Sequence, residues 1–305
     1  MKMSQIGLNR LCRLLVILML AIASCTMKEV QPVQAPPPVP PPKPAKIAVA
    51  LGAGASKGFA HIGVLKVLES NKIPIHIIIG TSAGSAIGSL YAYGYTAFEI
   101  QKMTFSVEQR DVVDLAIPEN GFIKGEKLEE FINRTVKYTS MEKLKIPFYA
   151  VATDIQNGQE IVFGRGNTGT AVRASCSIPG VFRPVRIGER VYVDGGLVSP
   201  VPVEAAKKLG ADVVIAVDVS SFSERFVPET TMETLLQSIN IMYSKLAATQ
   251  LLQADIVVRP KVGHISSSDF SKRHEAILEG EKAALEVLPR IMEIVAQLRQ
   301  EGRLE

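Results

Sequence analysis

The sequence lacks the features that a nucleic-acid-binding protein needs. It contains no tryptophan and few aromatic residues, and its lysines and arginines form neither a basic block nor an alternation with aromatics. Its formal charge of +4 rests on 34 basic and 30 acidic residues, but Lys2, Arg10 and Arg13 fall in an N-terminal segment that we interpret as a leader. Without those three, 31 basic residues face 30 acidic ones, a net charge of +1. Nucleic acid is bound mainly through clustered positive charge, so we exclude it as a partner.

The first 24 residues have the parts of a signal peptide. A positive stretch, MKMSQIGLNRLCR, precedes the apolar run LLVILMLAIA, which is too short to span a bilayer comfortably. The run ends in IASC at residues 22–25, which resembles the bacterial lipobox, in which the cysteine is lipidated and becomes the mature N-terminus. We therefore expect a signal peptide over residues 1–24 and a lipid on Cys25 that anchors the protein in the cell envelope. Thr26, in place of an aspartate, favours the periplasmic face of the outer membrane by analogy with lipoprotein sorting. An ordinary secreted protein and an uncleaved anchor are the alternatives.

This interpretation accounts for two of only three cysteines. Cys12 would leave with the leader and Cys25 would carry the lipid, so Cys176 remains as the one free thiol and no disulfide can form within the mature chain. Cys176 lies in RASCSIPG without a recognisable base. We expect a small buried residue there rather than a nucleophile.

A proline-rich segment, QPVQAPPPVPPPKPA, occupies residues 31–45. Such a composition cannot pack a core and favours extended polyproline II. We therefore expect residues 25–45 to form a semi-rigid tether. Residues 46–305 then form the folded domain, with its motifs between residues 46 and 209.

Apolar runs alternate with helical periods in this domain, which is typical of a parallel sheet covered on both faces. The first predicted strands are KIAVAL (46–51) and IPIHIII (73–79), and a helix follows each. Further strands are predicted at 146–154, 159–164, 182–187, 190–196, 211–219 and 253–260, and further helices at 124–138, 202–210, 232–253 and 271–300. Pro289 should kink or break the last helix. The predicted fold class is α/β, a three-layer α/β/α sandwich around a mostly parallel sheet.

The second predicted strand leads into Gly80-Thr-Ser82-Ala-Gly84 and a helix of small residues. A strand that turns sharply into a helix at a serine needs small neighbours, and the helix N-terminus adds partial positive charge. The pattern therefore indicates a nucleophile elbow with Ser82 as the nucleophile. A tight turn with an inert serine is the alternative, because a hydroxyl attacks only when a base takes its proton.

A glycine-rich loop, LGAGASKGF, follows the first predicted strand. It lacks the glycine spacing of a dinucleotide site, and no acidic residue ends the second strand. It also lacks the lysine and hydroxyl residue that close a P-loop. The N–H groups of such a loop can instead stabilise an oxyanion. Parallel strands would bring the loop beside Ser82.

Asp194-Gly195-Gly196 ends a later predicted strand. A carboxylate held against a serine and away from water has a raised pKa and can accept the proton. On its own, Asp-Gly-Gly is more typical of a plain turn than of a catalytic site.

The four histidines offer a second kind of base. His264 and His274 follow the serine and the acids, as in a Ser-Asp-His triad of the α/β-hydrolase type. His61 and His76 precede the serine and are expected in a helix near the glycine loop and at the start of a strand. A dyad of serine and aspartate needs none of them, so the two arrangements can be tested against each other.

Taken together, the three motifs resemble the patatin-like phospholipase family. The resemblance covers residues 46 to about 209 and includes GASKGFAHIGVLKVLE, GTSAGS, ATDIQNGQ, ASCSIPGVFRPV and VDGGLVSPVPV. It implies a serine acyl-ester hydrolase that acts on phospholipids or lysophospholipids through a Ser82–Asp194 dyad. It implies no metal or organic cofactor, and membrane lipids as substrate.

The same resemblance assigns supporting backbone positions. The oxyanion loop would comprise Gly52, Gly54, Ala55, Lys57 and Gly58. The chain departs from the family at Ala53-Gly54-Ala55, where many members have three glycines, and alanine does not easily take a positive φ. Which N–H groups line the oxyanion hole is therefore open.

Two other classes of function stay open on the sequence alone. One is a nucleotide-binding module that uses the glycine loop, and the other is a non-catalytic envelope protein. The segment 220–231, with Phe222, Phe226 and Val227, is either a lid or membrane-contacting loop or an ordinary surface loop. The sequence identifies no protein partner.

Overall fold

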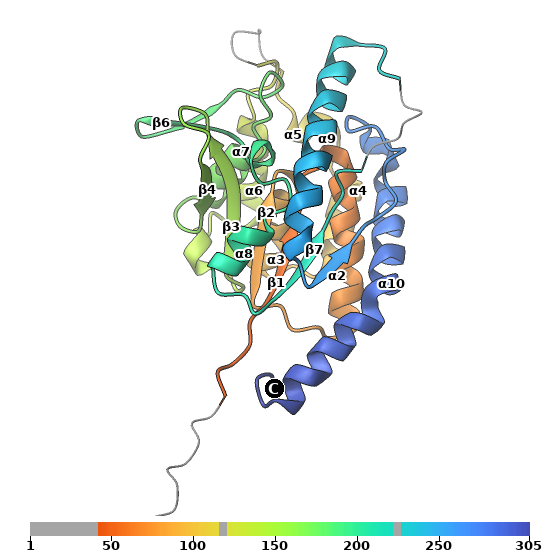
Figure 1. The fold of residues 1–305 in the computed structure, drawn as a ribbon. Coiled ribbons are helices and arrows are strands. Elements are labelled where there is room, and N and C mark those ends of the chain that lie inside the picture. The colour runs from red at the N-terminus through yellow and green to blue at the C-terminus, as the bar shows by residue number, and fades with distance from the viewer. Residues whose placement is uncertain (1–41, 116–120, 222–226) are drawn as a thin grey trace, which may run out of the picture. The chain divides into compact units, whose positions relative to one another are not determined.

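A central sheet organises the domain (Figure 1). The structure is a computed structural model that describes residues 42–115, 121–221 and 227–305. The predicted signal peptide, Cys25, the tether up to residue 41 and residues 222–226 of the predicted lid lie outside the described residues.

The sheet is mostly parallel, as predicted. Its parallel strands run in the order β3 (Phe148–Asp154), β2 (Ile77–Thr81), β1 (Ile47–Leu51), β7 (Val213–Val217) and β8 (Ile256–Val258). Three antiparallel strands extend it beside β3, namely β4 (Glu160–Phe163), β5 (Val185–Ile187) and β6 (Arg190–Asp194). The α/β fold class is confirmed, with an antiparallel margin at one side.

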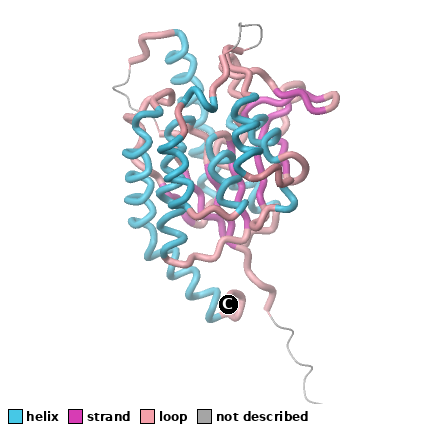
Figure 2. The backbone as a smooth tube through the Cα atoms, turned by 180° about the vertical axis from the view of Figure 1, so that it is seen from behind, coloured by secondary structure: helices cyan, strands magenta, loops and turns pink. Residues whose placement is uncertain are grey.

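Helices cover both faces of the sheet, which gives three layers (Figures 1 and 2). Side chains of α2 (Ala60–Ser70), α3 (Ala83–Tyr93) and α10 (Arg273–Gln300) pack on one face. Shorter helices join that layer: α4 (Ala97–Ser106), α6 (Glu126–Thr135) and α7 (Thr168–Ser175). The other face is covered by α8 (Val203–Lys208) and α9 (Thr231–Gln250). The short helix α5 (Gln109–Val112) lies between α4 and α6 in the chain.

The central strands are apolar throughout because both of their faces are buried. In β1, Ile47, Val49 and Leu51 point into the layer of α2, α3 and α10. Ala48 and Ala50 point to the opposite face, where α8 and α9 pack. All five side chains are fully buried, which explains the unbroken apolar run from which this strand was predicted.

The long C-terminal helix continues through Pro289 as one element. The proline therefore does not break it. Figure 1 shows that α10 changes direction part-way along its length, which agrees with the predicted kink.

Two helices, α4 and α7, were not predicted, and neither was the four-residue helix α5. Helices α4 and α7 are short, ten and eight residues, and each begins at a polar N-cap, Thr96 and Asn167. Both caps accept a hydrogen bond from the backbone three residues on. These caps, rather than long apolar periods, mark where the two helices begin.

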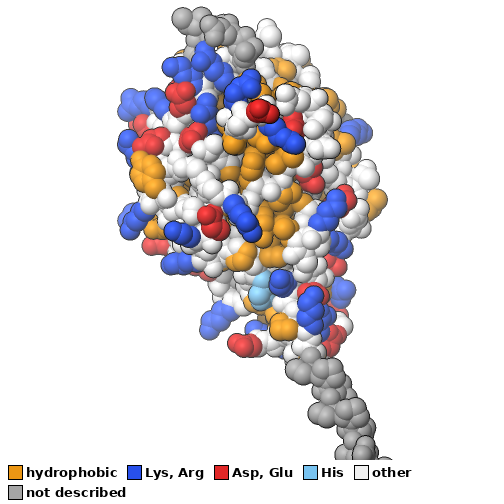
Figure 3. Space-filling view, turned by 90° about the vertical axis from the view of Figure 1, so that its left-hand side faces the viewer, with side chains coloured by type: hydrophobic (Ala, Val, Ile, Leu, Met, Phe, Trp, Pro, Cys, Tyr) orange, Lys and Arg blue, Asp and Glu red, His pale blue; other side chains and the backbone are white. Residues whose placement is uncertain are grey.

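Charged side chains of both signs lie on the side of the molecule that bears β4 and β6 (Figure 3). Figure 3 shows this side, with a band of hydrophobic side chains near its centre and with basic and acidic side chains interspersed around it.

Candidate active site

Ser82 lies in a strained turn between β2 and α3. Its φ of 54° and ψ of −123° are rare for a residue other than glycine. A Cβ at Gly80 would lie 2.5 Å from the carbonyl carbon of Gly84, and one at Gly84 would lie 2.1 Å from the carbonyl oxygen of Leu51. Both glycines of the predicted elbow are therefore needed for the strand to turn into the helix, and Ser82 is the N-cap of α3.

Strand β3 brings the serine and the aspartate together. Strands β2 and β6 share one edge of β3, because β4 pairs with residues 150–153 along the other edge. On the shared edge β2 ends at Thr81, opposite Val151, and β6 ends at Asp194, opposite Ala152. Since Ser82 directly follows Thr81, the turn after β2 and the end of β6 meet.

Asp194 is fully buried, and its two carboxylate oxygens have different surroundings. Oδ1 accepts hydrogen bonds from the Gly196 N–H at 2.7 Å and from the Tyr243 hydroxyl at 3.1 Å. Oδ2 has no hydrogen-bond partner among the described residues. Burial raises the pKa of Asp194 to about 6, although the hydroxyl of Ser82, the Gly196 N–H and Tyr243 each act to lower it.

The Ser82 hydroxyl is near enough to the carboxylate to lower the pKa of Asp194, yet no hydrogen bond of ordinary length and angle joins the two side chains. The two side chains are therefore close neighbours without a direct hydrogen bond. Catalytic hydrogen bonds are often long until a substrate aligns them.

The two glycines after Asp194 allow this close packing. A Cβ at Gly195 would lie 2.2 Å from the carbonyl oxygen of Val151, and one at Gly196 would lie 2.3 Å from the ring of Tyr243. The Asp-Gly-Gly turn is therefore fixed by its neighbours on β3 and α9.

The glycine loop runs from the end of β1 into a 3-10 turn, Ala55–Phe59. Ala55 takes a φ of 50°, so the chain adopts the left-handed conformation there in spite of the alanine. A Cβ at Gly58 would lie 2.4 Å from the Cβ of Ala83, so this glycine lets the loop touch the elbow.

Hydrogen bonds decide which N–H groups of the loop are available. The Gly52 N–H donates to Val217 and the Lys57 N–H donates to Gly54. The N–H groups of Gly54 and Ala55 form no hydrogen bond within the described part of the chain. Of the predicted oxyanion loop, these two residues therefore offer donors, whereas Gly52 and Lys57 use theirs internally.

Lys57 and His61 brace this loop from inside the protein. The Lys57 ammonium donates to the Ser221 carbonyl at 2.6 Å, and burial lowers its pKa to about 8, while Asp218 acts to raise it. His61 Nε2 lies 2.8 Å from the Gly52 carbonyl, and burial lowers the pKa of the ring to about 4. The ring is therefore neutral and donates from Nε2.

The remaining histidines are engaged elsewhere. His76 accepts a hydrogen bond from the Ile47 N–H, His264 pairs with Glu275 at 2.6 Å, and the ring of His274 lies against Phe105. Across the described residues, no histidine forms a hydrogen bond with Ser82 or Asp194. The geometry therefore does not support a Ser-Asp-His triad.

Cys176 is buried, as predicted, and burial with the nearby Asp194 raises the pKa of its thiol. The thiol lies 3.8 Å from the hydroxyl of Ser85. A protonated, enclosed thiol is a poor nucleophile.

An apolar cavity of about 320 Å³ opens in front of Ser82. Ala55, Gly58 and Ser82 line one part of it, so the glycine loop and the elbow face the same space. Most of the remaining wall is hydrophobic and comes from helices of both layers, and includes Leu90, Met103, Phe131, Ile178, Met232 and Leu236. Such a cavity suits an extended hydrocarbon group.

Sequence reasoning missed Ser175 and Tyr243. Ser175 Oγ accepts the Ser82 N–H at 2.9 Å and donates to the Val151 carbonyl at 2.6 Å. The Asp194 N–H donates to the Ser177 carbonyl at 2.8 Å. The end of α7 thus holds both reacting residues. Ser175 falls within the motif ASCSIPGVFRPV, whereas no motif pointed to Tyr243.

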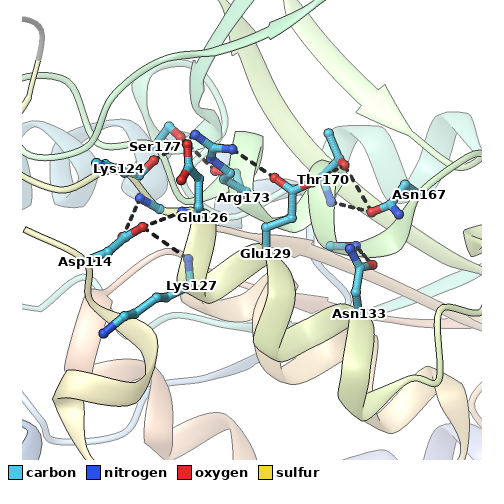
Figure 4. Close-up of polar contacts among 12 residues, drawn as sticks. Asp114, Lys124, Glu126, Lys127, Glu129, Asn133, Asn167, Thr170, Arg173 and Ser177 are labelled. Carbon is cyan, nitrogen blue, oxygen red and sulfur yellow. Dashed lines mark hydrogen bonds and ion pairs between the residues drawn. The ribbon is translucent and has the colours of Figure 1, made fainter. Parts of the chain in front are cut away.

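A polar network anchors α7 to α6 (Figure 4). Arg173 donates to the Glu129 carboxylate at 3.0 Å and to the Lys124 carbonyl at 2.8 Å. Asp114 accepts hydrogen bonds from three consecutive N–H groups, those of Gly125, Glu126 and Lys127, at the start of α6. The helix that carries Ser175 is therefore tied to its neighbour by a partly buried ion pair between Arg173 and Glu129.

Comparison with known proteins agrees with these motifs. The family model described as patatin-like phospholipase matches residues 49–207. The chain belongs to the patatin-like phospholipase family. Its match to the family model includes the glycine loop, the elbow, the end of α7 and the Asp-Gly-Gly turn.

Several curated proteins are similar to this patatin-like chain. An uncharacterized NTE family protein of Mycobacterium tuberculosis is 32% identical over 216 residues, which cover 68% of this chain and 60% of the relative. Lysophospholipase NTE1 of Scheffersomyces stipitis is 29% identical over 262 residues, which cover 75% of this chain and 17% of the relative. The chain thus spans less than two thirds of either relative.

Among solved structures, VipD from Legionella pneumophila has a TM-score of 0.48 at 12% identity, covering 82% of this chain and 67% of that one. This likeness is too distant to support a statement about function.

The described residues include neither a cluster of metal ligands nor a membrane-spanning helix. No group of three or more His, Cys, Asp or Glu side chains in residues 42–115, 121–221 and 227–305 is arranged to hold a metal ion. Within the same ranges, no helix has the length and apolar character needed to cross a membrane.

Proposed function

We propose that this protein hydrolyses acyl esters of phospholipids or lysophospholipids with Ser82 as nucleophile and Asp194 as base. The observation that carries the proposal is the meeting of a strained serine and a buried carboxylate beside an apolar cavity. The lysophospholipase among the relatives supports the class of substrate.

In the first step, Asp194 accepts the hydroxyl proton of Ser82 while Oγ bonds to the ester carbonyl carbon. The carbonyl π electrons move onto its oxygen, and the resulting oxyanion would take hydrogen bonds from the N–H groups of Gly54 and Ala55. The N-terminus of α3 adds partial positive charge at the same place.

The tetrahedral intermediate then collapses and expels the alcohol part of the lipid, which takes the proton from Asp194. Water attacks the acyl-serine in the same way and gives one proton to Asp194. The second tetrahedral intermediate then collapses and releases the fatty acid, and Ser82 Oγ takes the proton back from Asp194. The raised pKa of about 6 suits both roles, since the carboxylate is ionised at neutral pH and still basic enough to hold a proton briefly.

The cavity supports a hydrocarbon acyl chain as the bound group. Its walls offer little that could hydrogen-bond to a nucleotide, which disfavours the nucleotide-binding alternative. From this cavity and the predicted lipid on Cys25, we propose an enzyme that is anchored in a bacterial envelope and acts on membrane lipids.

The test is fatty-acid release from mixed phospholipid and lysophospholipid vesicles by the full-length protein. We expect Ser82→Ala and Asp194→Asn each to lower the rate by at least about a hundredfold, because each removes one partner of the proton transfer. A fluorophosphonate probe should label the wild type and not Ser82→Ala.

The matched control is the double variant His264→Ala/His274→Ala, whose side chains contact Glu275 and Phe105 instead of the dyad. It should keep wild-type activity. Loss of activity in a folded double variant would favour a triad, and an inactive wild type that resists the probe would contradict the hydrolase proposal.

A further inference from the structure

Tyr243 contacts Asp194 from α9, which packs on the face of the sheet opposite to α3. It lies on α9, 49 residues along the chain from Asp194, and its hydroxyl is 3.1 Å from Oδ1. The tyrosine is only 3% exposed, and its ring packs against Gly196. Phenol and carboxylate are therefore held together in a place that water does not reach.

The phenol can only be the donor in this contact. An ionised carboxylate has no proton to give, and burial together with the nearby Asp194 raises the pKa of Tyr243 well above its usual range. Oδ1 thus receives two donors, the phenol and the Gly196 N–H, while Oδ2 receives none from the described residues.

Unequal hydrogen bonding makes the two oxygens of the Asp194 carboxylate differ in how readily they accept a proton. Oδ1 already accepts two hydrogen bonds, so its lone pairs are a poor site for a proton. Oδ2 accepts none from the described residues and is the better site. Two donors on one oxygen also fix the plane of the carboxyl group. The hydrogen bonds to Oδ1 therefore leave Oδ2 as the oxygen that can accept the proton of Ser82.

We propose that Tyr243 is a positioning residue of the dyad, whose hydroxyl holds Oδ1 so that Oδ2 accepts the proton of Ser82. The inference rests on the proposed function, since it assigns Tyr243 a part in that same proton transfer. A purely packing role is the competing explanation, because Tyr243 also belongs to an apolar cluster with Ala53, Ile178 and Ile239.

The two explanations differ in how activity depends on pH. The groups that face Asp194 are Tyr243 on α9, Cys176 after α7 and the hydroxyl of Ser82, and the first two are neutral because the pKa of each is raised. Removing the phenol hydroxyl withdraws a donor from the ionised carboxylate and so raises the pKa of Asp194 further. Loss of packing alone would leave that pKa unchanged.

The experiment compares the full-length wild type with Tyr243→Phe, which keeps the ring against Gly196. We expect the acidic limb of the profile of kcat/KM against pH to move to higher pH. At pH values below that limb, kcat/KM should be about tenfold lower for each pH unit by which the limb moves. KM should change little, since the hydroxyl does not line the cavity.

Tyr138→Phe is the matched control. Tyr138 also donates its hydroxyl to a carboxylate, that of Glu130, at 2.8 Å, but it is 61% exposed. This variant should retain the wild-type profile. Incorporation of 3-fluorotyrosine at position 243 should move the limb the opposite way, because a more acidic phenol donates a stronger hydrogen bond.

A readout independent of turnover separates this inference from the proposed function. The carboxyl carbon-13 resonance of Asp194, assigned by its loss in Asp194→Asn, should titrate at higher pH in Tyr243→Phe than in the wild type. Equal midpoints in the two folded proteins would overturn the positioning role. A shifted midpoint in a protein without hydrolase activity would support the contact while contradicting the reaction.

Discussion

Asp194 lowers the stability of the protein at neutral pH. Its folded pKa of about 6 lies above the unfolded value near 3.8. Between those values the folded state keeps the proton while the unfolded state has lost it. The contribution of Asp194 to the free energy of unfolding therefore decreases as pH rises through this window, by about 3 kcal/mol, and stays level above it.

Replacing the carboxylate should remove this dependence. We expect Asp194→Asn to gain stability relative to the wild type as pH rises from 4 to 7, because the neutral amide has no charge to bury. Urea denaturation at a series of pH values measures the difference. Two curves that stay parallel across this range would show that Asp194 is not destabilised by burial.

The residues with a clear local pattern were the ones predicted. The elbow glycines and the Asp-Gly-Gly turn could be located because close backbone packing restricts their sequence. Tyr243 could not, since its contact with Asp194 arises only when α9 crosses the sheet. Alanine does not easily take a positive φ, which left the N–H groups of the oxyanion hole open, yet Ala55 takes the positive φ that glycine usually provides.

At the scale of elements, α7 is the support of the site. Ser175 accepts the Ser82 N–H and donates to β3, so it links the elbow to the central sheet. We expect Ser175→Ala to lower stability by about 1–3 kcal/mol, because it leaves a buried N–H without a partner. Activity should also fall while KM changes little, since the loss affects the position of the nucleophile.

The matched control for this change is Ser89→Ala. Ser89 is fully buried on α3, but its hydroxyl bonds only to the Ala86 carbonyl of its own helix. Thermal denaturation and steady-state kinetics of both variants make the comparison. If Ser89→Ala lost as much activity as Ser175→Ala, the link through α7 would have no special role.

The parallel order of the strands followed from composition, whereas the antiparallel margin did not. Strands β1, β2 and β7 are buried on both faces and therefore apolar throughout. Strands β4 and β5 are short and partly exposed, so their sequences carry no sign of direction. Yet β6, which also belongs to this antiparallel margin, ends at Asp194 and places it beside Ser82.

At the scale of the whole molecule, the C-terminal helix closes the domain by crossing α2 at two glycines. A Cβ at Gly63 would lie 2.0 Å from the Ile277 carbonyl oxygen, and one at Gly280 would lie 2.0 Å from the Ala60 carbonyl oxygen. The backbones of the two helices are in direct contact at these glycines. This contact places α10 next to the 3-10 turn of the glycine loop.

We expect Gly280→Ala to force these helices apart and to lower stability by about 1–3 kcal/mol or more. Lys282→Ala on the same helix removes only the ion pair of an exposed lysine with Glu279 and should cost less than about 1 kcal/mol. Differential scanning calorimetry would compare them. Equal melting temperatures for Gly280→Ala and the wild type would mean that the crossing is loosely packed.

The end of α10 also fastens the start of the domain. The Ala45 N–H donates to the Arg303 carbonyl, and the Arg303 guanidinium contacts Asp212 and the Lys43 carbonyl. Residues 43–45 therefore join the fold at the amino ends of the parallel strands, whereas Ser82 lies at their carboxyl ends. Any segment that precedes residue 43 therefore joins the domain at the edge of the sheet that lies opposite Ser82. If Cys25 carries a lipid, as proposed, the point of attachment and the candidate nucleophile lie at opposite edges of the same sheet.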